Sequence, residues 1–399
     1  MRFPHLLAVS LTGLLALAGC GNGATAQQPA SVTSTPAATP PVPSQPITAT
    51  PSTSAPPSPR TSRTPSPAPS PTTSPAKPKP PQTLPSPGSP NGQAAVPADA
   101  KAVDAERPDR VVGKGTPASC TSEAVVAAVA SGGVITFDCG PAPVTITMKA
   151  TAKVRNDRGP DVVLDGGGRV TLSGGNKRRI LYQNTCDAGQ RITTSHCQDQ
   201  PTPRLTVQNL AFTGGDATGE AAEGGGGGAI FVRGGRLKVV NSRFNANRCD
   251  PTGPDLGGAA IRVLSQSKNQ PVYVVNSTFT GGRCSNGGAL SSIGVSWTVL
   301  NSVFTGNQAI GRGANPAKTG TPGGGSGGAM YADGNNFTVT IKGSVIRDNQ
   351  ANEGGGAIFF VSNDRTGTLT LSRSTLKSNR SDGFETQPGI FFLGAKLSR

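Results

Sequence analysis

Three arginines occupy one position of a repeated phrase and are the side chains best placed to bind an anion. Arg248, Arg283 and Arg380 each lie four residues after an apolar residue, and Gln308 and Gln350 fill that position in the repeats between them. A guanidinium stays charged and pairs well with carboxylates and phosphates. The spacing predicts a discontinuous polar stripe that faces a ligand. The alternative is a set of solvated corner residues that bind nothing.

The overall charge favours an anionic partner. The 399 residues include 37 Lys and Arg against 22 Asp and Glu, a formal net charge of +15, and most of the excess lies in the repeats. A basic surface attracts anionic polymers by Coulomb forces. For an exported protein we expect acidic polysaccharide, teichoic acid or lipopolysaccharide as the partner, and nucleic acid fits that location poorly.

The residues offer little for catalysis. His196 is the only histidine beyond the amino-terminal segment, so Ser–His–Asp and Cys–His schemes lack a proton shuttle. One Trp and three Tyr are few for stacking sugars. The acids are scattered and share no repeat position: Asp165, Asp187, Asp216, Glu220, Glu223, Asp250, Asp255, Asp333, Asp348 and Glu353. The densest patch, Asp216 with Glu220 and Glu223, is expected to be a solvated loop. We therefore expect no catalytic residues and no cofactor.

Cysteine usage indicates an oxidising compartment. Of seven cysteines, Cys20 has a separate role described below, which leaves an even number for disulfides. Cys249 and Cys284 each lie five residues after a repeated Phe, so stacked coils would place them about 4.8 Å apart. Position along the chain predicts the pairs Cys120–Cys139, Cys186–Cys197 and Cys249–Cys284. There is no C-x-x-C pair, and we expect no metal site.

The scaffold for these side chains is a repeat. LKVVNSRFNANRC from Leu237 recurs in variant form from Leu205, Val272, Trp297, Val339 and Leu369. Glycine-rich phrases that end in GGA and an apolar residue alternate with it. Alternating apolar residues indicate half-buried strands, and units this short must stack to bury their apolar faces. The predicted inward columns are Phe212, Phe244, Phe279, Phe304, Ile346 and Leu376, and Val207, Val239, Val274, Val299, Ile341 and Leu371.

Asparagines recur at two further positions. The first column is Asn209, Asn241, Asn276 and Asn301, and the second is Asn247, Asn307, Asn349 and Asn379, interrupted by Gly282. Asn and Gly tolerate a positive φ, which sharp corners between parallel strands require. We expect both columns to form corners whose amides pair along the stack.

The alternation of GGA-plus-apolar with F-x-x-N resembles the polymorphic outer membrane protein repeat and, more broadly, bacterial β-helix proteins of the pectate-lyase-like superfamily. The resemblance covers about residues 118–394. Residues 118–139 predict a short capping helix that Thr121 or Ser122 can begin and Gly132-Gly133 can end. The resemblance implies an all-β, right-handed parallel β-helix. It says little about function, since that superfamily includes adhesins, lyases, hydrolases and inert surface proteins.

The amino-terminal part reads as an address and a spacer. Residues 1–19 resemble a lipoprotein signal peptide that ends at Leu-Ala-Gly, which makes Cys20 the lipidated first residue of the mature chain. Residues 20–98 are rich in Pro, Ser and Thr and predict a disordered linker. The β-helix domain is expected at 99–399, as a monomer held on the extracellular or outer-membrane face by its lipid.

Three functions fit these observations. We expect a non-catalytic, lipid-anchored surface protein for adhesion or for binding an anionic envelope polymer. A polysaccharide lyase or hydrolase and a structural envelope protein are the alternatives.

Overall fold

A computed structural model describes residues 84–190, 193–221, 224–313 and 322–399, all within one compact unit. The expected signal peptide, Cys20 and the linker up to residue 83 lie outside the described residues. None of the described helices combines the length and apolar character needed to span a membrane.

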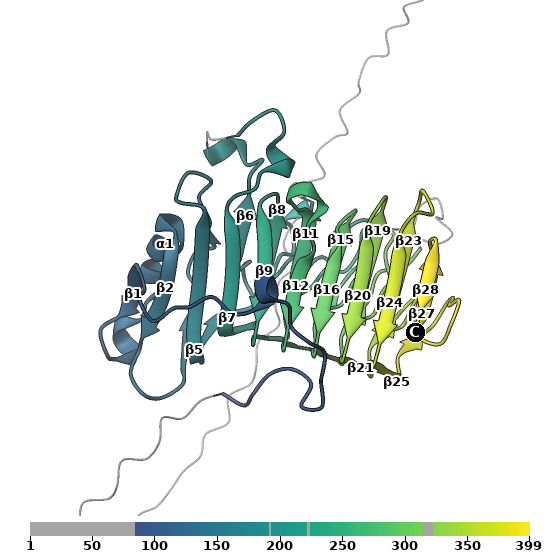
Figure 1. Ribbon diagram of the computed structural model, residues 1–399, viewed down its shortest axis with the longest axis horizontal. Coiled ribbons are helices and arrows are strands. Elements are labelled where there is room, and N and C mark those ends of the chain that lie inside the picture. The colour runs from purple at the N-terminus through teal and green to yellow at the C-terminus, as the bar shows by residue number, and fades with distance from the viewer. Residues whose placement is uncertain (1–83, 191–192, 222–223, 314–321) are drawn as a thin grey trace, which may run out of the picture. The chain divides into compact units, whose positions relative to one another are not determined.

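Successive coils contribute strands to parallel sheets that run along the molecule (Figure 1). The main row contains β5 (Asp161–Ser173), β7 (Arg204–Thr213), β9 (Arg236–Val240), β12 (Val272–Val275), β16 (Trp297–Leu300), β20 (Thr338–Lys342), β24 (Thr368–Ser372) and β28 (Lys396–Ser398). An eight-stranded sheet contains β4 (Ala152–Lys153), β6 (Leu181–Asn184), β8 (Ile230–Arg233), β11 (Ile261–Ser265), β15 (Leu290–Ile293), β19 (Met330–Gly334), β23 (Ile358–Ser362) and β27 (Ile390–Leu393).

Two rows of short strands complete each coil. The first pairs with the end of β7 and contains β10 (Arg243–Asn245), β13 (Thr278–Thr280), β17 (Val303–Thr305), β21 (Val345–Arg347) and β25 (Thr375–Lys377). The second is a four-stranded sheet of β14 (Arg283–Cys284), β18 (Gln308–Ala309), β22 (Gln350–Ala351) and β26 (Arg380–Ser381). This arrangement confirms the predicted all-β parallel β-helix.

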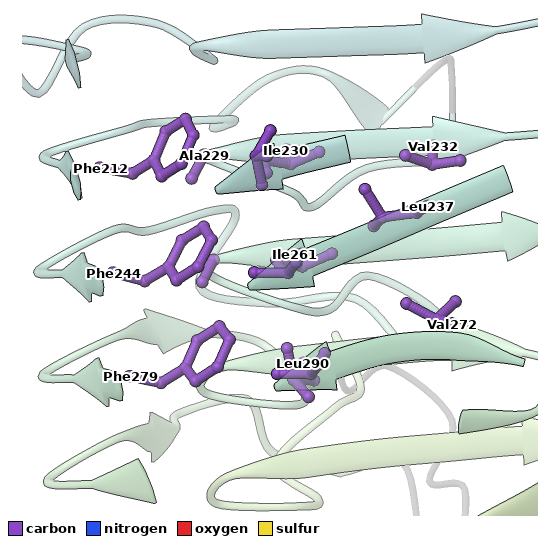
Figure 2. Close-up of a cluster of buried hydrophobic side chains, with 14 of the residues drawn as sticks. Phe212, Ala229, Ile230, Val232, Leu237, Phe244, Ile261, Val272, Phe279 and Leu290 are labelled. Carbon is purple, nitrogen blue, oxygen red and sulfur yellow. The ribbon is translucent and has the colours of Figure 1, made fainter. Parts of the chain in front are cut away.

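The core is built from columns of like side chains, as the repeat predicts. Phe212, Phe244, Phe279 and Phe304 stack with ring centroids 4.9, 4.6 and 4.8 Å apart. Figure 2 shows the first three of these rings. Strand register extends this column through Ile346 to Leu376. The second predicted column, from Val207 to Leu371, is also in register and buried. Parallel pairing without offset thus turns the sequence repeat into a continuous core.

The first asparagine column forms corners, as predicted. Asn209, Asn241, Asn276 and Asn301 have φ values of 51°, 48°, 46° and 52°. Asn241 Nδ2 donates to Asn209 Oδ1 at 3.1 Å, and Asn276 Nδ2 donates to Asn241 Oδ1 at 3.2 Å.

The second asparagine column corrects the prediction by one residue. Positive φ values occur at the preceding positions, Ala246, Gly306, Asp348 and Ser378. The asparagines themselves point inward and pair: Asn307 Nδ2 donates to Asn349 Oδ1, and Asn349 Nδ2 donates to Asn379 Oδ1, both at 2.9 Å. Their amides are therefore buried links between coils, and the left-handed turn is made by whichever residue comes before them.

A helix covers the first coils. α1 (Ser122–Ser131) begins after Thr121, whose hydroxyl accepts a hydrogen bond from Ala124 N at 3.2 Å, and ends at Gly132 with φ of 70°. Val125 and Val129 of α1 are buried in the main core. The helix lies near β1 (Arg110–Gly113) and β4, and the chain continues from it into β2 (Gly133–Asp138) and β3 (Val144–Thr147). Figure 1 shows the helix at the amino-terminal end of the stack. It therefore acts as the expected cap.

The six cysteines of the described residues form three disulfides. The pairs are Cys120–Cys139, Cys186–Cys197 and Cys249–Cys284, with Cα–Cα distances of 5.6, 4.9 and 4.8 Å. The first joins the start of the cap to the end of β2. The third joins adjacent coils at the spacing of neighbouring parallel strands.

A segment without strands, residues 84–109, lies across the outer side of the main row; we call it the strap. Figure 1 shows it as the dark-blue chain that crosses the main strands before entering β1. Ala94 and Ala100 of the strap are buried against Val240, Val275 and Leu300. The predicted boundary between linker and domain, at residues 98 and 99, falls inside this packed segment.

Candidate functional site

The structure aligns the three predicted arginines. Backbone pairing places Arg248 beside Arg283, Arg283 beside Gln308, Gln308 beside Gln350, and Gln350 beside Arg380. All three arginines are exposed. The predicted stripe therefore exists as a geometric column on the four-stranded sheet.

Two of these charges are already neutralised. Arg248 Nε donates to Asp216 Oδ2 at 2.8 Å, and Arg380 Nε donates to Asp382 Oδ1 at 2.8 Å. Arg283 alone of the three makes no ion pair with any described residue. One arginine in these five coils therefore keeps an unpaired charge. The column is a weak site for an anion, because the paired carboxylates offset the charges of the other two arginines.

A more concentrated set of cations lies on the main row, in a cavity of about 130 Å³ between the strap and the strands. We call it the strap pocket. Its charged and polar lining comprises Asp99, Asp161, Arg204, Thr206, Arg236, Lys238 and Tyr273. Outward-facing positions on neighbouring strands create it: Asp161, Arg204 and Arg236 are register partners, and Lys238 pairs with Tyr273 on the next strand.

One cation of the strap pocket is fully paired. Arg204 donates two hydrogen bonds to Asp161, from Nε to Oδ1 at 2.7 Å and from Nη2 to Oδ2 at 2.6 Å. This two-point geometry fixes both side chains and holds the pKa of Arg204 above its usual value. Asp161 is consequently committed to Arg204 and is poorly placed to act on a ligand.

Lys238 forms no ion pair with a carboxylate among the described residues. Its Nζ donates to the backbone carbonyl of Asp99 at 3.2 Å. Burial, the largest cause, lowers the pKa of Lys238, and nearby Arg236 adds to the lowering while Asp99 opposes it. An ammonium that is partly stripped of water and lacks a bonded anion gains energy when an anion arrives.

Tyr273 ties the strap to the strands. Its hydroxyl donates to Asp99 Oδ2 at 2.6 Å. Burial and this hydrogen bond raise the pKa of Tyr273 to about 12, so the hydroxyl keeps its proton at neutral pH and serves as a donor.

Arg236 is the unpaired cation of the strap pocket. It makes no ion pair or side-chain hydrogen bond with any residue that the structure describes. Lys238 lies two residues further along β9. Together they leave two positive groups whose charge the pocket's two carboxylates only partly balance. The strap pocket can therefore receive a carboxylate or phosphate group.

Two residues of the predicted acidic patch form ion pairs with arginines of neighbouring segments. Asp216 pairs with Arg248, and Glu220 lies 3.6 Å from Arg179, a buried arginine. Glu223 lies outside the described residues. Across residues 84–399, apart from the undescribed gaps, no three His, Cys, Asp or Glu side chains gather in a way that could hold a metal ion.

A second concave region, of about 440 Å³, lies on the eight-stranded sheet. Tyr331, Phe359 and Phe391 form part of its lining and stack on one another with centroids 5.0 and 5.1 Å apart. Because each ring's face is covered by its neighbour, the rings mostly present edges to solvent. Sequence reasoning missed this aromatic column, although the repeat signals part of it: Tyr331 and Phe359 each directly follow the inward apolar residue of a GGA phrase, and Phe391 follows Ile390 in a phrase without GGA.

Sequence reasoning also missed the strap pocket. The alternation in RLTV from Arg204 and RLKV from Arg236 was sufficient to place Arg204, Arg236 and Lys238 outward. Asp99 had no comparable signal, because its segment has the composition of a linker.

In comparisons with known proteins, no family model, no curated protein and no solved structure matches this chain.

Proposed function

We propose that this chain is a non-catalytic surface protein, lipid-anchored at Cys20, whose β-helix binds an anionic polymer of the cell envelope. The observation that carries the proposal is the strap pocket, where Arg236 and Lys238 lie two residues apart on β9 and neither forms an ion pair with a described residue. The formal net charge of +15 would draw such a polymer to the surface before it docks.

The hydrogen bonds made by the two acids of the strap pocket favour binding over catalysis. Asp161 accepts two hydrogen bonds from Arg204, and Asp99 accepts one from Tyr273. A general base needs a lone pair directed at the substrate, and these carboxylates direct theirs at neighbouring side chains.

Retention of the purified full chain on immobilised polymers tests the proposal. Polygalacturonate presents carboxylates and lipoteichoic acid presents phosphates, so the two columns separate the sources of negative charge. We expect retention on at least one polymer that falls steeply between 50 and 500 mM salt, as roughly expected for contacts screened over about 10 Å or less.

Matched variants locate the site. Arg236→Gln and Lys238→Gln are each expected to weaken retention about three- to tenfold, the effect of roughly 0.7–1.4 kcal/mol. Lys377→Gln, an exposed lysine on β25, is the control and should retain the wild-type affinity. Absence of binding by wild type, or equal losses in all three variants, would contradict the proposal, and release of unsaturated sugars from polygalacturonate would favour a lyase.

A further inference from the structure

The strap is bound to the main row in the way that a peptide ligand is bound. The Asn301 side chain pairs with both backbone groups of Ala94: Ala94 N donates to Oδ1 at 2.8 Å and Nδ2 donates to Ala94 O at 3.0 Å. Gln208 does the same with Val103, with both distances 2.8 Å. Two amide side chains thus read the strap's backbone as a neighbouring strand would.

Close packing adds to the hydrogen bonds that Asn301 and Gln208 make with the strap, which we call the two clamps. Ala94 and Ala100 cover an apolar stripe of Val240, Val275 and Leu300. At Gly88, which has φ of 82°, a Cβ would lie 2.7 Å from Asn276 Cα, so only glycine allows this approach. The strap is therefore fitted to this surface along most of its length.

Between the two clamps the strap places a carboxylate in the cationic pocket. Asp99 Oδ2 accepts from Tyr273, and the carbonyl of the same residue accepts from Lys238 Nζ. The other carboxylate of the pocket, Asp161, belongs to a main-row strand and is held by Arg204. Asp99 is thus the one acid that the strap brings to this pocket.

We propose that Asp99 is an internal anion that competes with the external ligand, so that strap docking and polymer binding exclude one another. This inference rests on the proposed function. A second carboxylate or phosphate beside Asp99 would meet a like charge in a partly desolvated site, which is unfavourable. The ligand therefore binds Arg236 and Lys238 best in the state in which the strap has left them exposed on β9, and by linkage its binding opens the strap.

Opening has a consequence for the tether. The strap directly continues the segment that leads back to Cys20, so its 26 residues, 84–109, would join the spacer. At 3.3–3.6 Å per residue this adds up to roughly 90 Å of reach. Binding of a polymer would therefore lengthen the connection between the β-helix and its anchor.

Hydrogen exchange of the full chain tests the strap without any ligand. The reporters are the amides of Ala94 and Val103, which donate to the clamps. Asp99→Asn should speed their exchange about two- to fivefold, the range for weakening one hydrogen bond, here the bond that Tyr273 donates to the Asp99 carboxylate. Asp104→Asn, an exposed acid five residues along the strap, is the control and should leave exchange unchanged. Unchanged exchange in Asp99→Asn would overturn the role of Asp99, whatever the polymer result.

The second arm adds polygalacturonate or lipoteichoic acid. Competition predicts that the bound polymer speeds exchange at Ala94 and Val103, and that Asp99→Asn binds polymer about two- to fivefold tighter than wild type. A polymer that binds and slows exchange, or weaker binding by Asp99→Asn, would show that the strap is a clamp and overturn the competition. Failure of both polymers to bind either protein would instead overturn the proposed function, and the competition with it.

Discussion

At the residue scale, the corner asparagines combine two tasks that no other residue type performs together. Asn241 has φ of 48°, accepts from Asn276 Nδ2 and donates to Asn209. Its short amide tolerates the left-handed region and reaches both neighbouring coils. Alanine satisfies neither requirement, and glycine satisfies only the backbone one.

This division predicts an ordered pair of substitutions. Asn241→Gly removes the amide links, while Asn241→Ala removes them and also strains the backbone. We expect Asn241→Ala to lower the free energy of unfolding by about 1 kcal/mol more than Asn241→Gly. Urea denaturation of both variants measures the difference. If alanine proved equal to or better than glycine, the corner would not be backbone-limited.

Asp364 supplies a pH-dependent turn. It accepts from Ser362 Oγ at 2.6 Å and from Thr366 N at 3.1 Å, and these hydrogen bonds lower its pKa to about 2, the Ser362 bond being the largest cause. A carboxyl whose pKa is depressed on folding stabilises the fold above its unfolded pKa of about 3.8 and loses that contribution as pH falls toward 2.

Asp364→Asn should therefore lower Tm at pH 6 and have a smaller effect at pH 2, where about half of the wild-type carboxyl is itself neutral. Thermal unfolding at the two pH values measures this difference. Asp104→Asn, in an exposed carboxylate of the strap, serves as the control. A Tm deficit that is the same at both pH values would place the effect in packing rather than charge.

At the element scale, one inward position at the four-stranded sheet holds a disulfide in two coils and alanines in the next two. Cys249 and Cys284 face inward at the position where Ala309 and Ala351 pair on later coils. The pairing of Ala309 with Ala351 shows that this position also accepts small side chains without a disulfide. The disulfide therefore adds a covalent link to a junction that the repeat could close by pairing alone.

Cys249→Ala with Cys284→Ala should consequently fold to the same structure with less stability. The link spans 35 residues, and the chain-entropy estimate for a loop of that length is about 4 kcal/mol. Cys186→Ala with Cys197→Ala opens a loop of 11 residues and should cost about 1 kcal/mol less. Guanidinium denaturation compares the two, and the reverse order would show that native strain or residual structure, rather than loop length, dominates.

The elements differ in how far the sequence reveals them. The columns of Phe244 and Val239 are predictable because an inward strand position must be apolar in every coil, so the repeat displays it. The second asparagine column was placed one residue off, because Ala246 and Ser378 carry no signal for positive φ. The docking of the strap was not predicted, because its proline-rich composition predicts a linker. Asn301 and Gln208 bind the strap through its backbone, so its own sequence carries no pattern of side chains for this contact.

The same limit applies to the site. Period-2 alternation places Arg236 and Lys238 outward, but only the docked strap makes them walls of a pocket. The arginine stripe was correctly aligned from spacing. The ion pair of Arg248 could have been predicted from the same spacing, because Asp216 lies four residues after Phe212 and occupies the same repeat position one coil earlier. The ion pair of Arg380 with Asp382 joins two residues of one coil, and the repeat carries no signal for it.

At the scale of the whole molecule, stability is expected to be a sum of contributions from neighbouring coils. Phe279 contacts Phe244 on one side and Phe304 on the other, at 4.6 and 4.8 Å between centroids. Phe212 and Phe304 belong to the same column but lie three strand spacings apart, roughly 14 Å. Energetic coupling should follow contact and vanish over that distance.

Double-mutant cycles with Phe→Leu substitutions measure that coupling, because leucine keeps the site apolar and removes the ring. Each single change should cost about 1–2 kcal/mol in urea denaturation. Phe244→Leu with Phe279→Leu should show a coupling of about 0.5–1.5 kcal/mol, since one change already removes the stacked pair. Phe212→Leu with Phe304→Leu should be additive within about 0.5 kcal/mol. Strong coupling in the distant pair would mean that the column responds as one rigid body, and the picture of coils that interact only with their neighbours would have to be abandoned.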